Sequence, residues 1–148
     1  MFFDLLDINF KKGKCIIVSA FLSPYGSNDI IRRFNLILDT GASSTHISKE
    51  FLYRMEYDNT MFTKDKKESF AVIGRYHATL CKVSQINFCG VNFRNRTVKV
   101  WNPPTGHHVD GIIGMDILSY FNININMDTQ KAYIEQSQST KALLRKST

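Results

Sequence analysis

Short apolar segments separated by turn residues run through almost the whole chain, and this pattern restricts the fold more than any other feature. Three of them occupy residues 3–10, 15–22 and 30–38. Apolar runs of this length, bounded by turn residues, are typical of β-strands. Residues 48–57 instead predict one short helix, with Ser48 as its N-cap and Glu50 in its first turn. The sequence therefore predicts an all-β domain with one or two short helices.

The second half of the chain predicts a succession of hairpins. Residues 69–83 read as two extended arms, and residues 84–101 as a hairpin that turns at Cys89 and Gly90. Residues 122–136 predict a final hairpin. Apolar residues recur on both sides of these turns, as expected for strands that share a core.

The length of 148 residues suits one hydrophobic core and is short for two. We expect one domain over residues 1–136, followed by a polar, basic and poorly ordered tail over residues 137–148. The formal charge of +6 includes cations of that tail, so the domain itself is only mildly basic. Residues 92–101 alone interleave aromatic and basic side chains, and we expect no nucleic-acid partner.

The sequence indicates neither export nor membrane insertion. The first residues lack the regions of a signal peptide, and the longest strongly apolar run, residues 15–22, is too short to cross a bilayer. Three cysteines without a CxxC spacing, Cys15, Cys81 and Cys89, are typical of reduced thiols, although a disulfide between Cys81 and Cys89 is an alternative. We therefore expect a cytoplasmic protein without a membrane partner.

Residues 34–48, FNLILDTGASSTHIS, contain an apolar strand that runs straight into a carboxylate. Apolar residues occupy both faces of this strand, so we expect its end, and Asp39, to be buried or in the floor of a cleft. A carboxylate is costly there unless it is paired, hydrogen-bonded or protonated. Asp39 is therefore either a turn residue that ends a strand or a carboxylate kept for chemistry.

A second segment, VDGIIGMDIL at residues 109–118, follows later in the chain. Together the two segments resemble the retropepsin type of aspartic proteases, the single-domain relatives of pepsin. The family's apolar residues followed by Asp-Thr-Gly-Ala match residues 36–42, and its later apolar-apolar-Gly segment matches Ile112, Ile113 and Gly114. The resemblance covers residues 16–134. It implies a closed β-barrel in which the two segments cross in the shape of the letter ψ.

The resemblance also implies a role for each residue of the first motif. Asp39 supplies the catalytic carboxylate, and Thr40 supplies a hydroxyl that ties two active-site loops together. Gly41 has no Cβ, so another chain or a substrate can approach its backbone, and Ala42 follows it in the loop. The family activates water between two carboxylates without a covalent intermediate, so we expect no cofactor and no metal.

One Asp-Thr-Gly occurs in the chain, whereas this chemistry needs two carboxylates. The segment VDGI at residues 109–112 has no threonine, and MDTQ has Gln130 where glycine is required. We therefore expect a homodimer that forms about the active site, with Asp39 of each chain at the two-fold axis. Two such carboxylates share one proton. The expected function is that of an aspartic endopeptidase acting on a peptide or protein.

Retropepsins cover their site with a β-hairpin flap from each chain, and by position residues 69–77 are the candidate flap here. Near its tip stand the candidate substrate contacts Ile73, Gly74, Arg75 and Tyr76. The flaps of the family usually hold more glycine than this one. The bulkier tip predicts either a narrower substrate range or a flap that folds differently.

Other interpretations compete with this one. A catalytically silent module of the same fold, binding peptides or dimerising a larger assembly, has the same sequence pattern. His107, His108 and Asp110 invite a metal site, but no second cluster completes a tetrahedral shell. Asp116 is expected at the start of a short helix, where the helix dipole favours a carboxylate. Lone surface or half-buried histidines are expected at His46 and His77.

Overall fold

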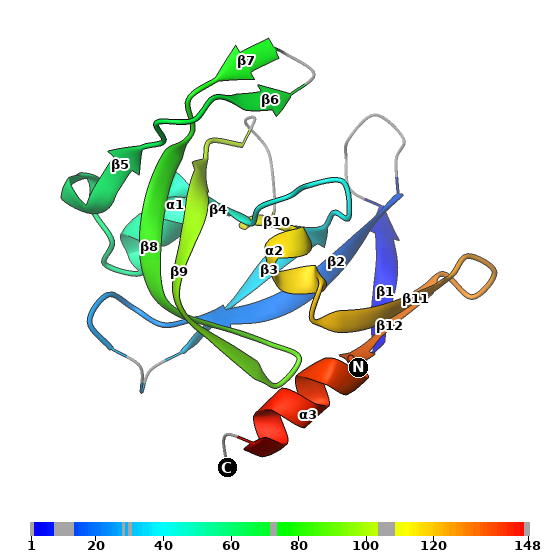
Figure 1. Ribbon diagram of the computed structural model, residues 1–148. Coiled ribbons are helices and arrows are strands. Elements are labelled where there is room, and N and C mark those ends of the chain that lie inside the picture. Colours follow the sequence, from blue (N-terminus) through cyan, green and yellow to red (C-terminus); the bar gives the residue numbers. More distant parts are fainter. Residues whose placement is uncertain are drawn as a thin grey trace.

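The computed structural model of the chain describes residues 2–7, 14–27, 29, 31–71, 74–103 and 109–146 (Figure 1). Strands dominate, namely β1 (Phe2–Asp7), β2 (Lys14–Leu22), β3 (Arg32–Leu38), β4 (His46–Ser48), β5 (Phe62–Lys64), β6 (Ser69–Ala71), β7 (Gly74–Tyr76), β8 (Thr79–Phe88), β9 (Val91–Trp101), β10 (Gly111–Ile113), β11 (Phe121–Asn126) and β12 (Lys131–Gln136). Between and after them lie α1 (Lys49–Arg54), the 3-10 helix η1 (Asn59–Met61), α2 (Met115–Leu118) and α3 (Gln138–Lys146).

A ring of strands closes into a barrel. The order around it is β2, β3, β10, β4, β9 and β8, and β8 pairs again with β2 to complete the ring. Strands β1, β12 and β11 extend the sheet outward from β2, while β5 pairs with the first residues of β8 (Figure 1). The prediction of an all-β fold built on a closed barrel with short helices is confirmed.

Buried and half-buried residues alternate along β3, and this alternation shows which face of the strand fills the barrel. Phe34, Leu36 and Leu38 are buried, whereas Asn35 and Ile37 on the other face are half-buried. The buried face packs into a core with the inward residues of β2, β8 and β9 and with helix α1. Because the second face of β3 is covered only in part, the end of the strand opens toward the surface beside Asp39.

Strand β10 is inserted between β3 and β4, and this is the central feature of the topology. It pairs in parallel with β3 and antiparallel with β4. The two motifs of the sequence are therefore neighbours in the sheet, with Ile112 opposite Ile37 and Ile113 opposite Leu38. Two glycines permit this close approach. A Cβ on Gly111 would lie 2.1 Å from the carbonyl oxygen of His46, and one on Gly114 would lie 2.6 Å from that of Ser44.

Local signals in the sequence place α1 and the β8–β9 turn. The hydroxyl oxygen of Ser48 accepts the N–H of Phe51 at 3.1 Å, which caps α1 as predicted. At the β8–β9 turn Cys89 and Gly90 have φ angles of 47° and 80°. Two left-handed residues in succession match the right-handed twist of a hairpin, so the predicted turn forms at the predicted place.

Strands β6 and β7 form a separate hairpin that stands above the end of the barrel (Figure 1). Ser69 pairs with Tyr76 and Phe70 with Arg75. This hairpin corresponds to the candidate flap, although residues 72 and 73 at its turn lie outside the described residues. Tyr76 of this hairpin lines one hollow with Ile112 of β10, the strand that pairs with β3.

We expected residues 137–148 to be poorly ordered, but residues 138–146 form helix α3. The hydroxyl oxygen of Ser137 accepts the N–H of Thr140 at 3.2 Å, and the carbonyl of Ser137 accepts the N–H of Lys141 at 2.9 Å. The buried hydroxyl of Thr140 donates to the carbonyl of Tyr120 at 2.9 Å. These hydroxyl contacts fix the first turn to the domain, which a compositional argument about a polar tail does not capture.

The cysteines Cys15, Cys81 and Cys89 are free, so the alternative of a disulfide between Cys81 and Cys89 does not hold. Burial raises the pKa of both Cys81 and Cys89 to about 11. Their thiols therefore stay protonated and unreactive at neutral pH. Within the described chain, no helix combines the length and apolar character needed to span a membrane.

Replacing Gly114 by alanine tests the crossing of the two motifs. The new Cβ would lie 2.6 Å from the carbonyl oxygen of Ser44 and 2.8 Å from that of Ala42. Because both atoms belong to the backbone, we expect Gly114→Ala to lower the free energy of unfolding by about 1–3 kcal/mol. Chemical denaturation measures this loss, with Ser119→Ala on the same segment as the control. Unchanged stability of Gly114→Ala would contradict the packing described here.

Candidate active site

Asp39 directly follows β3 and begins a tight loop, residues 39–45, that leads into β4. Its N–H donates to the carbonyl of Ile113 at 3.1 Å, and its carbonyl accepts the N–H of Ala42 at 3.2 Å. One carboxylate oxygen accepts the N–H of Gly41 at 2.8 Å. A Cβ on Gly41 would lie 3.2 Å from that oxygen, closer than an ordinary contact. Gly41 therefore leaves room for the carboxylate to fold back against its own loop.

Thr45 and Asp116 lock this loop onto the start of α2. The hydroxyl of fully buried Thr45 donates to Oδ1 of Asp116 at 2.8 Å, and its N–H donates to Oδ2 at 3.0 Å. The same hydroxyl oxygen accepts the N–H of Gly114 at 3.2 Å. Hydrogen bonds to an ionised carboxylate are stronger than neutral ones. They hold the Asp39 loop and the second motif as one unit.

The backbone of the loop also completes the N-terminus of α2. The carbonyl of Ala42 accepts the N–H of Met115 at 2.8 Å, and the carbonyl of Ser43 accepts the N–H of Asp116 at 3.2 Å. The first N–H groups of a helix have no partner within the helix, so these carbonyls supply what the helix itself cannot. Asp116 lies in the first turn of α2, as the sequence predicted.

The tip of the Asp39 loop is open in the single chain. Thr40 and Gly41 are exposed, and Asp39 is half-buried. Within the described part of the chain, the N–H of Gly41 is the one group that donates a hydrogen bond to the Asp39 carboxylate. The chain thus presents a rigid carboxylate at its surface, with free acceptor capacity on the outward side.

Two other carboxylates near this region have structural partners. Asp116 is held by Thr45, as described above. Asp110 accepts the N–H of Asn35 at 3.0 Å and lies 3.4 Å from the guanidinium of Arg54, so it joins β3, β10 and α1. His107 and His108 lie outside the described residues. Among the residues that are described, no group of three His, Cys, Asp or Glu side chains could hold a metal ion.

His46 lies on β4 beside the active-site motifs. Its Nδ1 is 2.9 Å from the carbonyl of Ser44. Burial lowers the pKa of His46 below 6.5, and the positive charge of Lys99 acts in the same direction. The bond to Ser44 and the charges of Asp116 and Asp39 oppose this shift. His46 is therefore mostly neutral near pH 7 and senses the charge of the candidate catalytic carboxylate.

The candidate flap residues face different ways. Tyr76 lines a hollow of about 420 Å³ between the β6–β7 hairpin and the barrel. The guanidinium of Arg75 instead lies 3.7 Å from the Glu68 carboxylate and 5.3 Å from the centre of the Phe70 ring. Gly74 is part of the hairpin, and Ile73 lies outside the described residues. The single chain thus brings Tyr76, and not Arg75, to this hollow.

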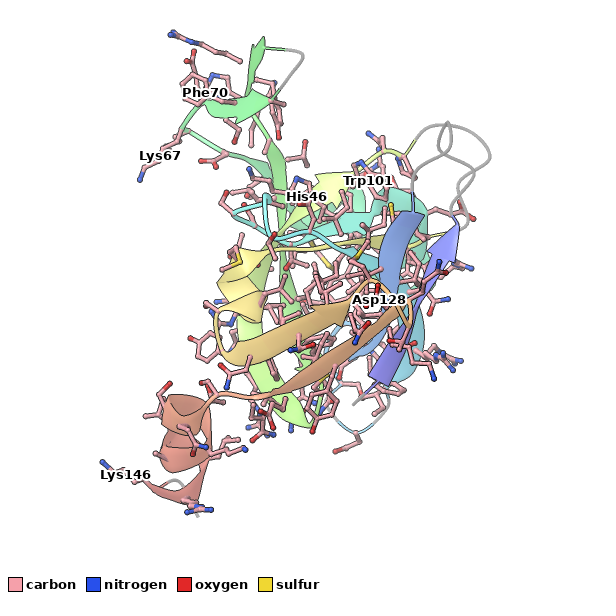
Figure 2. All side chains as sticks on the ribbon, turned by 90° about the vertical axis from the view of Figure 1, so that its right-hand side faces the viewer. His46, Lys67, Phe70, Trp101, Asp128 and Lys146 are labelled. Carbon is pink, nitrogen blue, oxygen red and sulfur yellow. The ribbon has the colours of Figure 1, made fainter. Side chains whose placement is uncertain are left out.

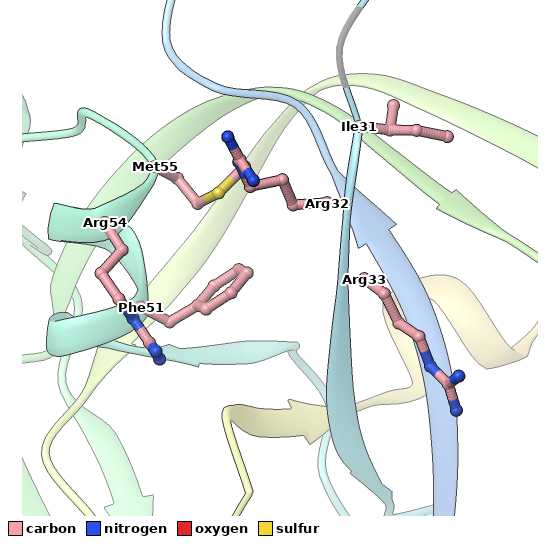
Figure 3. Close-up of a pocket in the computed structure, with 6 residues that line it drawn as sticks. All are labelled: Ile31, Arg32, Arg33, Phe51, Arg54 and Met55. Atoms are coloured by element: carbon pink, nitrogen blue, oxygen red, sulfur yellow. The ribbon is translucent and has the colours of Figure 1, made fainter.

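A second hollow lies at the opposite end of β3 from Asp39. It has a volume of about 560 Å³, and its lining residues are Ile31, Arg32, Arg33, Phe51, Arg54 and Met55 (Figure 3). Two of its three cations have local partners, since Arg33 donates to the Ser19 hydroxyl at 3.0 Å and Arg54 pairs with Asp110. None of its lining residues is a carboxylate, so the candidate site stays with Asp39.

Solved structures share this architecture. A retropepsin-like aspartic protease from Rickettsia conorii aligns with a TM-score of 0.62 and 18% identity, over 93% of this chain and 92% of that one. The EIAV protease, in complex with the inhibitor HBY-793, aligns with a TM-score of 0.50 and 22% identity, over 77% of this chain and 92% of that one. The chain therefore has the retropepsin fold.

The sequence also matches a family directly. Residues 31–120 match the family described as "gag-polyprotein putative aspartyl protease", and this segment contains both motifs and the candidate flap. The chain belongs to this family of retropepsin-like aspartic proteases. No protein with curated annotation matches the chain in sequence.

Sequence reasoning missed the residues that support the site. Thr45 follows two serines and belongs to no recognised motif, although its spacing of six from Asp39 places it where the loop re-enters the barrel. The helix dipole explained the position of Asp116 but not its bonds to Thr45. A buried hydroxyl needs a partner, so a threonine between a motif and an apolar strand was the signal available.

Replacing Thr45 by valine tests whether the Thr45 hydroxyl holds the Asp39 loop to the start of α2. Valine keeps the shape but leaves the N–H of Gly114 without its partner, and Oδ1 of Asp116 keeps only the N–H of Ile117 as a donor. We expect Thr45→Val to reduce the free energy of unfolding by about 1–3 kcal/mol, because an unsatisfied buried polar group costs that much. Thermal and chemical unfolding give the value, and exposed Thr63→Val is the matched control. Equal stability of the two variants would show that the Thr45 hydroxyl holds nothing.

Proposed function

We propose that the chain is an aspartic endopeptidase that acts as a homodimer, with one Asp39 from each chain in a shared active site. One observation carries this proposal. The Asp39 loop is locked from behind by Thr45 and Asp116 but is exposed at Thr40 and Gly41. A rigid carboxylate with an open face is half of a two-carboxylate site, and a second copy related by a two-fold axis supplies the other half.

The chemistry follows from placing two carboxylates within hydrogen-bond distance. Such a pair holds one proton, because two like charges at this distance are strongly unfavourable. The ionised Asp39 takes a proton from a water molecule, whose oxygen attacks the carbonyl carbon of the peptide bond. The protonated Asp39 donates its proton to the carbonyl oxygen. The resulting diol collapses when a proton passes to the nitrogen and the C–N bond breaks.

Two other parts of the chain have roles in this proposal. The exposed hydroxyl of Thr40 reaches the partner's loop and keeps the two carboxylates at a fixed distance. The β6–β7 hairpin stands above the barrel (Figure 1), and its Tyr76 lines one hollow with Ile112 of β10. It closes over a bound peptide and excludes bulk water from the reacting bond.

Replacing Asp39 by asparagine tests the proposal against a catalytically silent module of the same fold. We expect the purified chain to cleave members of a peptide library between pH 4 and 7, with more activity on the acidic side. Asp39→Asn removes the acid and base, so the cleavage rate falls by about 100-fold or more. Mass spectrometry of the products measures the effect.

Asp128→Asn provides the control for this experiment. Asp128 is exposed in the β11–β12 turn (Figure 2). Its replacement changes the net charge by the same amount and should leave cleavage intact. Cleavage that persists in Asp39→Asn, or a wild-type chain that cleaves no peptide, would reject the proposed activity.

A further inference from the structure

A row of side chains crosses the sheet from the Asp39 strand to β9. In the register of the sheet Ile37 is opposite Ile112, Ile112 is opposite His46, and His46 is opposite Lys99. Laterally paired residues point to the same face of a sheet, and Asp39, two residues after Ile37, continues that face. The row therefore forms one surface that begins at the candidate catalytic carboxylate and ends at an ammonium group.

The β6–β7 hairpin covers the end of this row that is formed by Lys99. The Nζ of Lys99 donates to the hydroxyl of Ser69 at 3.1 Å and lies 6.0 Å from the centre of the Tyr76 ring. The hollow of about 420 Å³ lies between this hairpin and the floor made by Ile112, His46 and Lys99. Figure 2 shows His46 and Trp101 beneath the hairpin that carries Phe70. A peptide bound at Asp39 would enter this hollow with its neighbouring side chains.

The charge of the hollow is unbalanced. Its lining among the described residues includes Lys99, two histidines and several apolar side chains, but neither Asp nor Glu. Half-buried Lys99 has no carboxylate within 4 Å in the described part of the chain, and the neutral Ser69 hydroxyl is its hydrogen-bond acceptor. A partly desolvated ammonium group is stabilised far more by an anion than by a hydroxyl.

We propose that Lys99 makes this hollow a subsite for an acidic side chain of the bound peptide, with His46 beside it. Strands lie about 4.8 Å apart, so Lys99 stands about 14 Å from β3, a span that about four extended residues cover. The acidic residue therefore lies within about four positions of the cleaved bond. The preferred cleavage of peptides with an acidic residue at this position rests on the proposed function. The preferred binding of such peptides does not.

Peptides that differ in one residue test this selectivity. Each position within four residues of a cleaved bond is occupied in turn by Glu, Gln or Lys, and kcat/KM is measured for each peptide. We expect the wild-type chain to prefer Glu over Gln about tenfold at one position, the effect of a charge-assisted hydrogen bond. Lys99→Glu should reverse the preference, so that Lys is favoured over Glu at that position.

Two further variants separate charge from structure. Lys99→Gln keeps a donor for Ser69 but removes the charge, so the kcat/KM ratio between the Glu and Gln peptides should fall to about one. Lys82→Glu is the control, because Lys82 is exposed on β8 and does not line the hollow. It should keep the wild-type preference. A ratio between two peptides is insensitive to a general loss of folded protein.

A binding measurement distinguishes failure of this inference from failure of the proposed function. Fluorescence anisotropy gives the affinities of the same peptides for Asp39→Asn and for Asp39→Asn combined with Lys99→Gln. If the wild-type chain cleaves nothing but Asp39→Asn binds Glu peptides more tightly, and only when Lys99 is present, the subsite stands and the enzyme does not. If cleavage and binding show no preference for Glu, or Lys99→Gln leaves that preference intact, the inference is overturned.

Discussion

The fold depends on the close insertion of β10 between β3 and β4. Gly111 and Gly114 bracket this strand, and a Cβ at either position would strike backbone atoms of the Asp39 loop or of β4. The insertion brings Asp116 under the loop, where the hydroxyl and N–H of Thr45 bind its two oxygens. The position of the Asp39 carboxylate is therefore set by a backbone approach that glycine alone allows.

This arrangement makes the single chain rigid behind the carboxylate and open in front of it. The buried side of the loop is satisfied by Thr45, Gly114 and the start of α2, while Thr40 and Gly41 are exposed. A turn residue that merely ends a strand needs no such support. The same row of side chains that leads away from Asp39 reaches Lys99 under the hairpin, so catalysis and the choice of peptide share one surface in our account.

Much of the fold could be predicted from the sequence because its signals are local. Ser48 as an N-cap, the Cys89-Gly90 turn and the short apolar runs each depend on residues close together in the chain. The ψ-shaped crossing came from a resemblance to a family, since no local rule pairs residue 37 with residue 112. The bonds of Thr45 and the first turn of α3 were missed, because each depends on a hydroxyl whose partner is distant in sequence.

The central claim is that a working site contains Asp39 from two chains. Mixing wild-type and Asp39→Asn chains at a constant total concentration, under conditions where dimers exchange, measures how many copies are needed. If both are required, activity falls with the square of the wild-type fraction, to about one quarter in an equal mixture of randomly paired chains. Activity that falls in proportion, to about one half, would show that each chain works with its own Asp39 alone and would contradict the account.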